Sequence, residues 1–167
     1  KQALILYCKA FRGGRSQEEI DTLAQSNAGT QALRSMPLHF RDLDMLLWIF
    51  PEDPAIPHLP EVSDPARVTA HLPYLSLPKG LERAEDIRSV KVEVVNYRPE
   101  LRCTARYDLS WGAADQAQSL TIFGKTFRSG EGRDVFARSE YLWNRCAGVE
   151  ENVLFAQPLG YMPAVQT

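Results

Sequence analysis

The second half of the chain alternates between apolar and polar residues. Valines alternate with charged residues over 91–94, and a second stretch, 102–109, alternates in the same way after the segment "YRPEL". A period of two is typical of a strand with one buried face, and Pro99 suits the second position of a tight turn. The pattern predicts an antiparallel hairpin over 91–109 and a third strand over 119–127.

After the third strand the period changes to that of a helix. Apolar and small residues recur on one helical face over 133–147, and the closing stretch "NVLFAQPLGYMPAVQT" has strand character. From residue 89 on, the expected order is therefore three strands, a helix and two strands. This order predicts an α+β fold, in which a five-stranded antiparallel sheet has one helix packed across it.

The first fifty residues predict a smaller unit of one strand, one helix and two strands. Residues 2–8 are apolar, "RGGR" turns the chain, and Ser16 with Glu19 fits a capping box for a helix over about 17–25. The segment "PLHFRDLDMLLWIFP" then favours two strands joined by a polar turn near 41–44.

Seven of the eleven prolines lie between residues 51 and 80. Their missing N–H donors and fixed φ angles exclude a sheet interior, so this stretch is expected to connect two domains. One short helix is expected in "SDPARVTAHL", capped by Ser63 or Asp64 and with Pro65 in its first turn. The predicted division is a partial unit over 1–50, a proline-rich connector over 51–88 and a main domain over 89–167.

The amino-acid composition limits the kinds of molecule that this chain is expected to bind. The 167 residues are 44% hydrophobic and 24% charged, with a net charge of −2, so neither nucleic acid nor a membrane surface is an expected partner. Residues 98–138 carry seven basic against five acidic side chains, a local excess that suits a small anion.

The cysteines and the apolar runs bear on the compartment. Cys8, Cys103 and Cys146 are far apart, no histidine lies at metal-ligand spacing, and no metal site is expected. The run "MLLWIF" is far too short to span a membrane, so we expect a cytoplasmic protein. Because the chain starts at Lys1 and stops at "PAVQT", we expect a fragment of a longer protein.

One pattern occurs twice. "LYCKAFRGGRSQEEI", residues 6–20, and "IFGKTFRSGEGRDVF", residues 122–136, both read as an aromatic, a lysine, a Phe-Arg pair and a glycine turn into a helix, with Lys9 matching Lys125. A duplication and a chance convergence of two strand–turn–helix units both explain the echo. The first copy is expected to be degenerate, because the helix position that matches Glu140 is Ala24 and Glu19 does not replace it cleanly.

Residues 89–167 resemble the small N-terminal lobe of the protein-kinase-like fold. The wording "NYRPELRCTARYDL" and "TIFGKTFRSGEGRDVFARSEYLWN" is similar to the version found in aminoglycoside phosphotransferase-like enzymes. The resemblance implies that Lys125 holds the phosphates of ATP and that the helix residue Glu140 orients it. No glycine-rich loop is present, and Arg98 and Arg102 stand at the hairpin tip where they could contact phosphate. The alternative interpretation is that Lys125, Glu140, Arg98 and Arg102 are ordinary solvated charges on the protein surface.

The resemblance implies a nucleotide-binding small lobe of a small-molecule kinase, with an aminoglycoside, a sugar, choline or another hydroxyl compound as the acceptor. The Mg²⁺ ligands and the catalytic base would lie in a C-terminal lobe, so no catalytic residue is expected in this chain and the chain alone is predicted inactive. The other interpretation is a pseudokinase-like interaction or regulatory module. The sequence predicts no oligomeric state.

Overall fold

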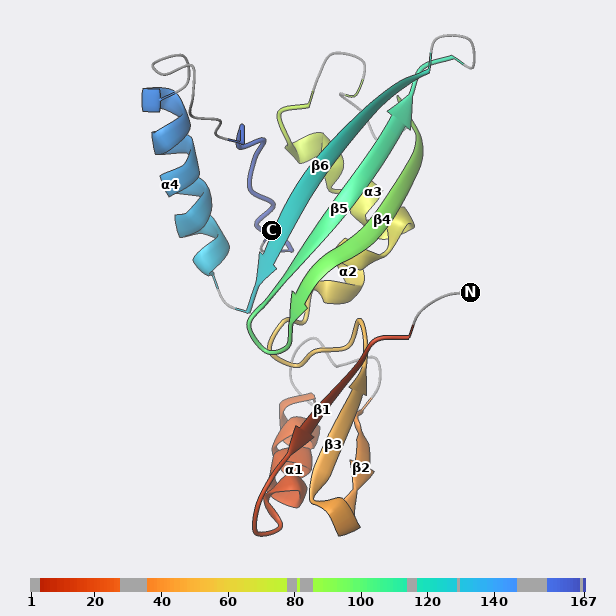
Figure 1. Cartoon of the computed structure of the whole chain (residues 1–167), viewed down its shortest axis with the longest axis vertical. Helices are drawn as coiled ribbons and strands as arrows, with labels where there is room; N and C mark the ends of the chain where they lie inside the picture. The colour runs from red at the N-terminus through yellow and green to blue at the C-terminus, as the bar shows by residue number, and fades with distance from the viewer. Residues whose placement is uncertain are drawn as a thin grey trace.

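A computed structural model shows a mixed α+β fold with two antiparallel sheets, which confirms the predicted class (Figure 1). It describes residues 4–27, 36–77, 81, 86–113, 117–128, 130–146, 156–165 and 167. The elements, in chain order, are β1 (Leu6–Ala10), α1 (Arg15–Asn27), β2 (Leu38–Phe40), the 3-10 helix η1 (Arg41–Leu43), β3 (Met45–Ile49), α2 (Leu59–Ser63), α3 (Pro65–Thr69), the 3-10 helix η2 (Leu72–Tyr74), β4 (Ile87–Arg98), β5 (Arg102–Trp111), β6 (Gln118–Phe127) and α4 (Glu131–Cys146).

The first sheet has the strand order β1-β3-β2. Its elements follow the strand, helix and two strands expected for residues 1–50. Lys9, Leu46 and His39 lie opposite one another across the sheet, and they share the face that α1 covers. Leu46 and Trp48 are buried on that face, so the apolar run in β3 supplies the core of this unit.

The other face of the first sheet carries no charged side chain. It is formed by Leu6, Cys8, Ala10, Leu38, Phe40, Met45, Leu47 and Ile49. Leu6 is 50% exposed and Leu38 is 54% exposed. Of the three strands only β3, with the sequence MLLWI, is apolar on both faces, a pattern typical of strands buried on both sides, whereas α1 covers one face here.

The second sheet has the order β4-β5-β6, and its register follows the predicted hairpin. Alternate residues of β5, from Cys103 to Trp111, are buried against α3, the region around η2 and the C-terminal residues 156–165. The other face is polar. Pro99 occupies the second position of the turn, in which the Leu101 N–H donates to the Arg98 carbonyl at 3.1 Å.

The connector forms the short helix expected in "SDPARVTAHL". The Asp64 carboxylate accepts a hydrogen bond from the Ala66 N–H at 2.8 Å, and Pro65 is the first residue of α3. This is the cap that the sequence predicted, with Asp64 rather than Ser63 supplying the oxygen.

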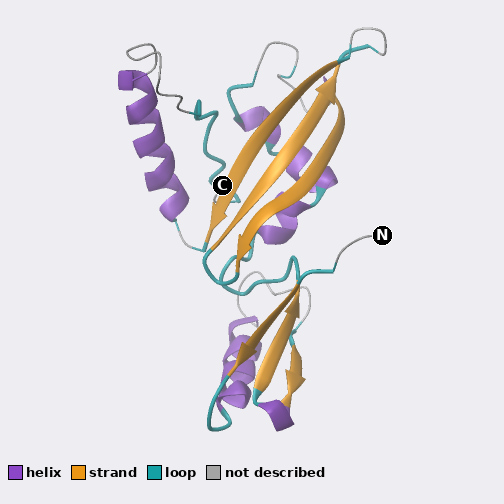
Figure 2. Cartoon of the chain, in the orientation of Figure 1, coloured by secondary structure: helices purple, strands orange, loops and turns teal. Residues whose placement is uncertain are grey.

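Two expectations for the C-terminal part are wrong for the residues that the structure describes. Residues 156–165 and 167 form loops and turns and no strand, so the second sheet has three strands where five were expected (Figure 2). Residues 147–155, where further strand was expected, lie outside the described residues. The physical reason is that Met162 and Val165 bury their side chains in the core, while the Leu159 carbonyl accepts a hydrogen bond from the Ser76 N–H at 2.7 Å.

The α4 helix stands beside the edge strand β6 instead of packing across the sheet (Figure 1). Of its described residues only Gly132 is buried, whereas Val135 is 39% exposed and Leu142 45% exposed. The strand-to-helix step from β6 to α4 therefore repeats the step from β1 to α1, but the two strands that follow α1 have no counterpart among the described residues after α4. The duplication stays a prediction.

The expected capping box at the start of α1 is also wrong. The helix begins at Arg15, and the Asp44 carboxylate accepts hydrogen bonds from the Gly14 N–H at 2.8 Å and the Ser16 N–H at 2.9 Å. Glu19 instead pairs with Lys9. The cap comes from the turn before β3, which lies next to α1 only in the folded unit.

None of the described helices is long and apolar enough to cross a membrane.

Candidate functional site

Three of the four predicted site residues lie on the polar face of the second sheet. Arg98 and Arg102 are direct cross-strand partners, and Lys125 is the partner of Thr104. Since Arg102 and Thr104 are two residues apart on β5, all of these side chains share one face, opposite the buried Cys103. Directly opposite residues have Cβ atoms about 5 Å apart and diagonal ones about 7–8 Å, so the three cations gather at the hairpin end of the sheet.

Farther from the hairpin tip, Arg106 and Asp108 on this face form an ion pair. The Arg106 guanidinium donates to the Asp108 carboxylate at 3.0 Å, and the Thr121 hydroxyl donates to the same oxygen at 2.6 Å. The hydrogen bond from Thr121, followed by the contacts with Arg106, holds the pKa of Asp108 below its usual value. Among the described residues no ion pair involves Arg98, Arg102 or Lys125. The hairpin end of the face is therefore positively charged, with its cations facing solvent.

The fourth predicted residue, Glu140, is not brought to Lys125. Both side chains are exposed, and no ion pair joins them in the described part of the chain. The Lys125 ammonium lies 5.5 Å from the centre of the Phe127 ring. Because Lys125 projects from the polar face while α4 stands beside the strand edge, the expected pair is absent from this structure, and its formation on nucleotide binding stays a prediction.

Phe123 is a candidate that sequence reasoning missed. It is 65% exposed, it lies two residues before Lys125 on β6, and it therefore shares the polar face. The alternation in "TIFGKTF" could have found it, because Ile122 and Gly124 take the covered face and leave Phe123 with Lys125. An exposed ring beside cations offers a surface on which a planar base stacks.

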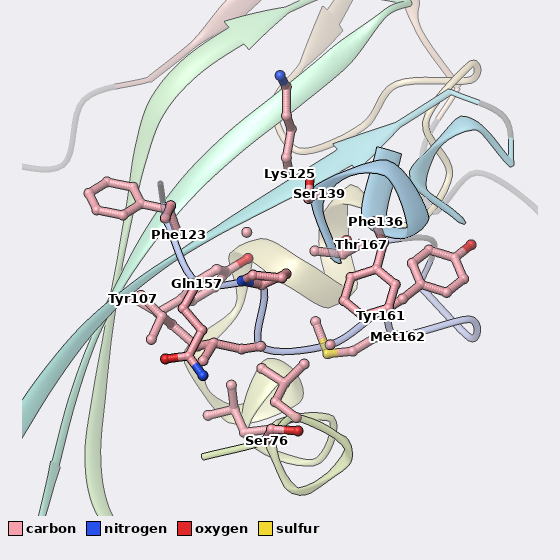
Figure 3. A pocket seen from close by; sticks show the side chains of 18 of the residues that line it. Ser76, Tyr107, Phe123, Lys125, Phe136, Ser139, Gln157, Tyr161, Met162 and Thr167 are labelled. Atoms are coloured by element: carbon pink, nitrogen blue, oxygen red, sulfur yellow. The ribbon is translucent and has the colours of Figure 1, made fainter. Parts of the chain in front are cut away.

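A cavity of about 860 Å³ lies on the other side of β6, between this strand, α4 and the segment from Ala156 to Thr167 (Figure 3). Apolar side chains dominate its lining, among them Ile122, Phe136, Leu159 and Met162. In Figure 3 the Lys125 side chain is directed away from these residues. Lys125 and Phe123 also belong to the lining, so the cavity combines a mainly apolar surface with one cation, whose ammonium is directed away from the apolar side chains.

Several polar groups at the cavity are already bonded within the protein. The Tyr107 hydroxyl donates to the Val62 carbonyl at 2.9 Å, and the hydroxyls of Thr126 and Thr167 lie 2.6 Å apart. Burial raises the pKa of Tyr107 above its ordinary value. A Cβ on Gly124 would lie 2.8 Å from Cε2 of Tyr107, so glycine is required for this ring to pack against β6.

The ion pair between a strand lysine and a helix glutamate forms in the first unit instead. The Lys9 ammonium lies 2.8 Å from the Glu100 carboxylate and 3.5 Å from the Glu19 carboxylate of α1. Burial lowers the pKa of Lys9, but the hydrogen bonds and charges of Glu100 and Glu19 outweigh it, and the net pKa is raised. Glu19 was not expected to take this role, and Glu100 is remote in sequence.

A Ser–His contact in the first unit was also missed. The Ser16 hydroxyl lies 2.9 Å from Nε2 of His39, but the Ser16 side chain is only 2% exposed and the Asp44 carboxylate is occupied by backbone N–H groups. A substrate cannot reach the hydroxyl, so this contact ties α1 to β2 and is not a nucleophilic site.

No group of three or more His, Cys, Asp or Glu side chains suited to a metal ion occurs among the described residues. Fold and site together define a mixed α+β protein with a cationic sheet face at a hairpin tip. Comparison with protein-family models, with curated proteins and with solved structures found no match.

Proposed function

We propose that this chain is the nucleotide-binding small lobe of a small-molecule kinase, an ATP-dependent phosphotransferase of the aminoglycoside phosphotransferase-like kind. The observation that supports the proposal is the shared face of Arg98, Arg102 and Lys125, on which no carboxylate is paired with them among the described residues. Phe123 adds an exposed ring to the same face. Cations for the phosphates and an aromatic surface for the base are the two elements that a nucleotide requires.

Each residue has a separate role in this proposal. The planar guanidinium groups of Arg98 and Arg102 bind phosphate oxygens through paired N–H donors, and Lys125 acts as a point charge. Phe123 stacks on the adenine. Glu140 orients Lys125 only if α4 moves toward the sheet when nucleotide binds.

The proposal assigns binding, and not transfer, to these residues. Phosphoryl transfer needs carboxylates that hold Mg²⁺ and a group that orients the acceptor hydroxyl, and the resemblance places both in a C-terminal lobe. The acceptor is an aminoglycoside, a sugar, choline or a related hydroxyl compound, and the compartment is the cytoplasm. The chain alone is proposed to be inactive.

The test is a titration of Mg·ATP into the chain, followed by backbone NMR shifts. We expect a dissociation constant in the range of about 1 mM, the affinity of a few charged contacts on an open face. Shifts should concentrate at the hairpin tip and on β6, and Lys125→Met should weaken binding. Lys91→Met, which removes another exposed strand lysine, is the matched control. Equal affinity in the two variants, or shifts spread elsewhere, would contradict the proposal.

A second titration with inorganic tripolyphosphate separates the base from the phosphates. Phe123→Ala should weaken ATP binding by about tenfold, since stacking of a base on an aromatic ring contributes about 1–3 kcal/mol. Tripolyphosphate has no base, so its affinity should be unchanged in this variant. A loss for both ligands would show that Phe123 acts through the structure of the sheet.

A second candidate function is a pseudokinase-like interaction or regulatory module. Two observations favour it: no ion pair joins Lys125 and Glu140 in the described part of the chain, and the exposed face of the first sheet is uncharged. Absence of any shift with either ligand would support this alternative.

A further inference from the structure

The hairpin tip holds a residue in an unusual backbone conformation. Glu100, the third residue of the turn between β4 and β5, has a φ of +60°. This left-handed region is unfavourable for residues other than glycine, because Cβ crowds the following carbonyl oxygen. A glutamate remains there only where its surroundings hold it.

Tyr7 of β1 and two further groups outside the second sheet hold Glu100. Its N–H donates to the Asp53 carboxylate at 2.9 Å, and its own carboxylate accepts a hydrogen bond from the Lys9 ammonium at 2.8 Å. Lys9 belongs to β1 of the first unit, and Asp53 belongs to the connector. Both the backbone N–H and the side-chain carboxylate of Glu100 are therefore bonded to groups outside the second sheet.

Asp53 is a strong anchor for this contact. It is only 1% exposed, and its carboxylate also accepts hydrogen bonds from the Tyr97 hydroxyl at 2.8 Å and the Ala55 N–H at 2.9 Å. Three donors on one buried carboxylate fix its position, because each donor would lose its partner if the group moved. Tyr97 is the residue before the turn and Glu100 is its third residue, so Asp53 contacts both the end of β4 and the turn itself.

The residues that the tip carries are the two arginines of the proposed phosphate site. Arg98 and Arg102 are cross-strand partners on either side of the turn, and Glu100 lies between them in sequence. A free carboxylate at this point would pair with one of the arginines or repel a phosphate. By binding Glu100, Lys9 removes that competition as well as fixing the turn.

We propose that Lys9 and Asp53 are positioning residues for the phosphate site: they hold the hairpin tip from outside the second sheet and leave both guanidinium groups free for an anion. This inference rests on the function proposed above. It assigns a role to the first unit: Lys9 does not contact the nucleotide, but it holds in position the hairpin tip whose arginines do.

The experiment combines amide hydrogen exchange with ATP titration on the full chain. In Lys9→Met we expect exchange at the amides of Glu100 and Leu101 to speed up at least fivefold and the dissociation constant for Mg·ATP to rise at least threefold. Lys9→Arg keeps the charge and should stay near the wild-type values. Lys91→Met, the control with the same chemical change on β4, should change neither quantity.

A second variant tests the other anchor. Asp53→Asn keeps the volume of the side chain but replaces one acceptor oxygen with a donor, so the amide of Glu100 should again exchange faster. Circular dichroism establishes that the variant is folded. If Asp53→Asn does not fold, Tyr97→Phe removes one donor from the carboxylate and should produce a smaller change of the same sign.

The outcomes separate this inference from the proposed function. Unchanged exchange at the tip in Lys9→Met overturns the inference, whatever happens to ATP. Faster exchange with an unchanged dissociation constant overturns the positioning role but leaves nucleotide binding intact. If the wild-type chain binds neither ATP nor tripolyphosphate, the proposed function and the positioning role both fall, while faster exchange still establishes the hold on the tip.

Discussion

Lys9 and Lys125 stand at the same point of two similar sequence patterns, yet they differ in their ion pairs. Each lies on a strand that leads through a glycine-containing turn into a helix. Both ammonium groups lie near the ring of the phenylalanine two residues on, Lys9 at 5.4 Å from Phe11 and Lys125 at 5.5 Å from Phe127. Lys9 also pairs with Glu19 and Glu100, whereas Lys125 has no ion pair among the described residues. The local pattern therefore determines the strand and the helix, and the partners of the lysine depend on which other elements reach it.

The two sheets differ in the same way at their exposed faces. The first sheet leaves eight uncharged residues uncovered, and the second sheet leaves a face of arginine, lysine, threonine and aspartate. The continuous apolar run of β3 and the alternation of polar and apolar residues in β5 already show this difference in the sequence. Each sheet carries one cysteine, Cys8 or Cys103, so the difference in exposure between the two faces can be measured by thiol labelling.

The largest expected effect is the difference in thiol reactivity between the two sheets. Cys8 lies on the exposed face of the first sheet, and Cys103 lies on the covered face of the second, where burial raises its pKa to about 12. A thiol with that pKa has about a thousandfold less thiolate than one at 9.0, and solvent exclusion slows it further. In a Cys146→Ser background, labelling with Ellman's reagent at pH 8 should proceed in two phases. Equal rates for Cys8 and Cys103 would contradict the assigned faces.

Removal of the buried Asp53 carboxylate, which holds Glu100 beside Lys9, should have the next largest effect, on the free energy of unfolding. Asp53→Ala leaves three donors without their partner, and we expect a loss of about 3 kcal/mol in the free energy of unfolding. Urea unfolding measures it. Asp42→Ala, which removes an exposed carboxylate from η1, should change the same quantity by less than about 0.5 kcal/mol. Similar losses in both variants would show that Asp53 is no anchor.

The two lysines should differ in their contribution to stability. Lys9→Met removes a partly exposed pair with two carboxylates, and we expect a loss of about 1 kcal/mol. Lys125→Met removes no ion pair of the described residues and should stay within about 0.5 kcal/mol of the wild type. The difference for Lys9 should be fully present below the ordinary lysine pKa of 10.5 and should be lost as the pH rises through the higher pKa that Lys9 has in the folded state, because a raised pKa means that folding favours the protonated form. A larger loss for Lys125→Met would reverse the comparison.

The smallest expected effect concerns the start of α1, which Asp44 caps. Hydrogen bonds from Ser16 and Gly14 hold the pKa of Asp44 below its usual value of 3.8. Its contribution to stability is therefore present above that value and is lost as the pH falls through the lower pKa of the folded state. Wild type should melt at a higher temperature than Asp44→Asn at pH 6, and the gap should close as the pH approaches 2. A gap independent of pH would mean that the carboxylate charge is not what matters.

The elements of the fold were largely predictable because local patterns determine them. The alternation in 102–109 gave the hairpin, Pro99 gave its turn, and Asp64 with Pro65 gave the start of α3. The site was predictable in part for the same reason. Once the register of β4 and β5 follows from the turn, Arg98 and Arg102 must face each other, and the same reasoning places Lys125 beside them.

What could not be predicted depends on contacts between distant parts of the chain. The apolar stripe of α4 predicted a helix packed across the sheet. It did not indicate that Met162 and Val165, in a loop and turn, would fill the core where further strands were expected. Glu100 reads as a turn residue, and nothing near it in sequence points to Lys9. Asp53 lies among prolines, where its burial depends on Tyr97 from a strand more than forty residues later. Local propensity does not contain such pairings.

The contact between Lys9 and Glu100 spans 91 residues, and this separation bears on the order of events during synthesis. The first sheet can close once β3 has left the ribosome, whereas the glutamate that completes the surroundings of Lys9 is translated about 5–18 s after the lysine at typical elongation rates. The first unit thus exists for a time with the Lys9 ammonium paired with Glu19 but not yet with Glu100. When the hairpin of β4 and β5 is synthesised, the Lys9 side chain that binds Glu100 is therefore already in place.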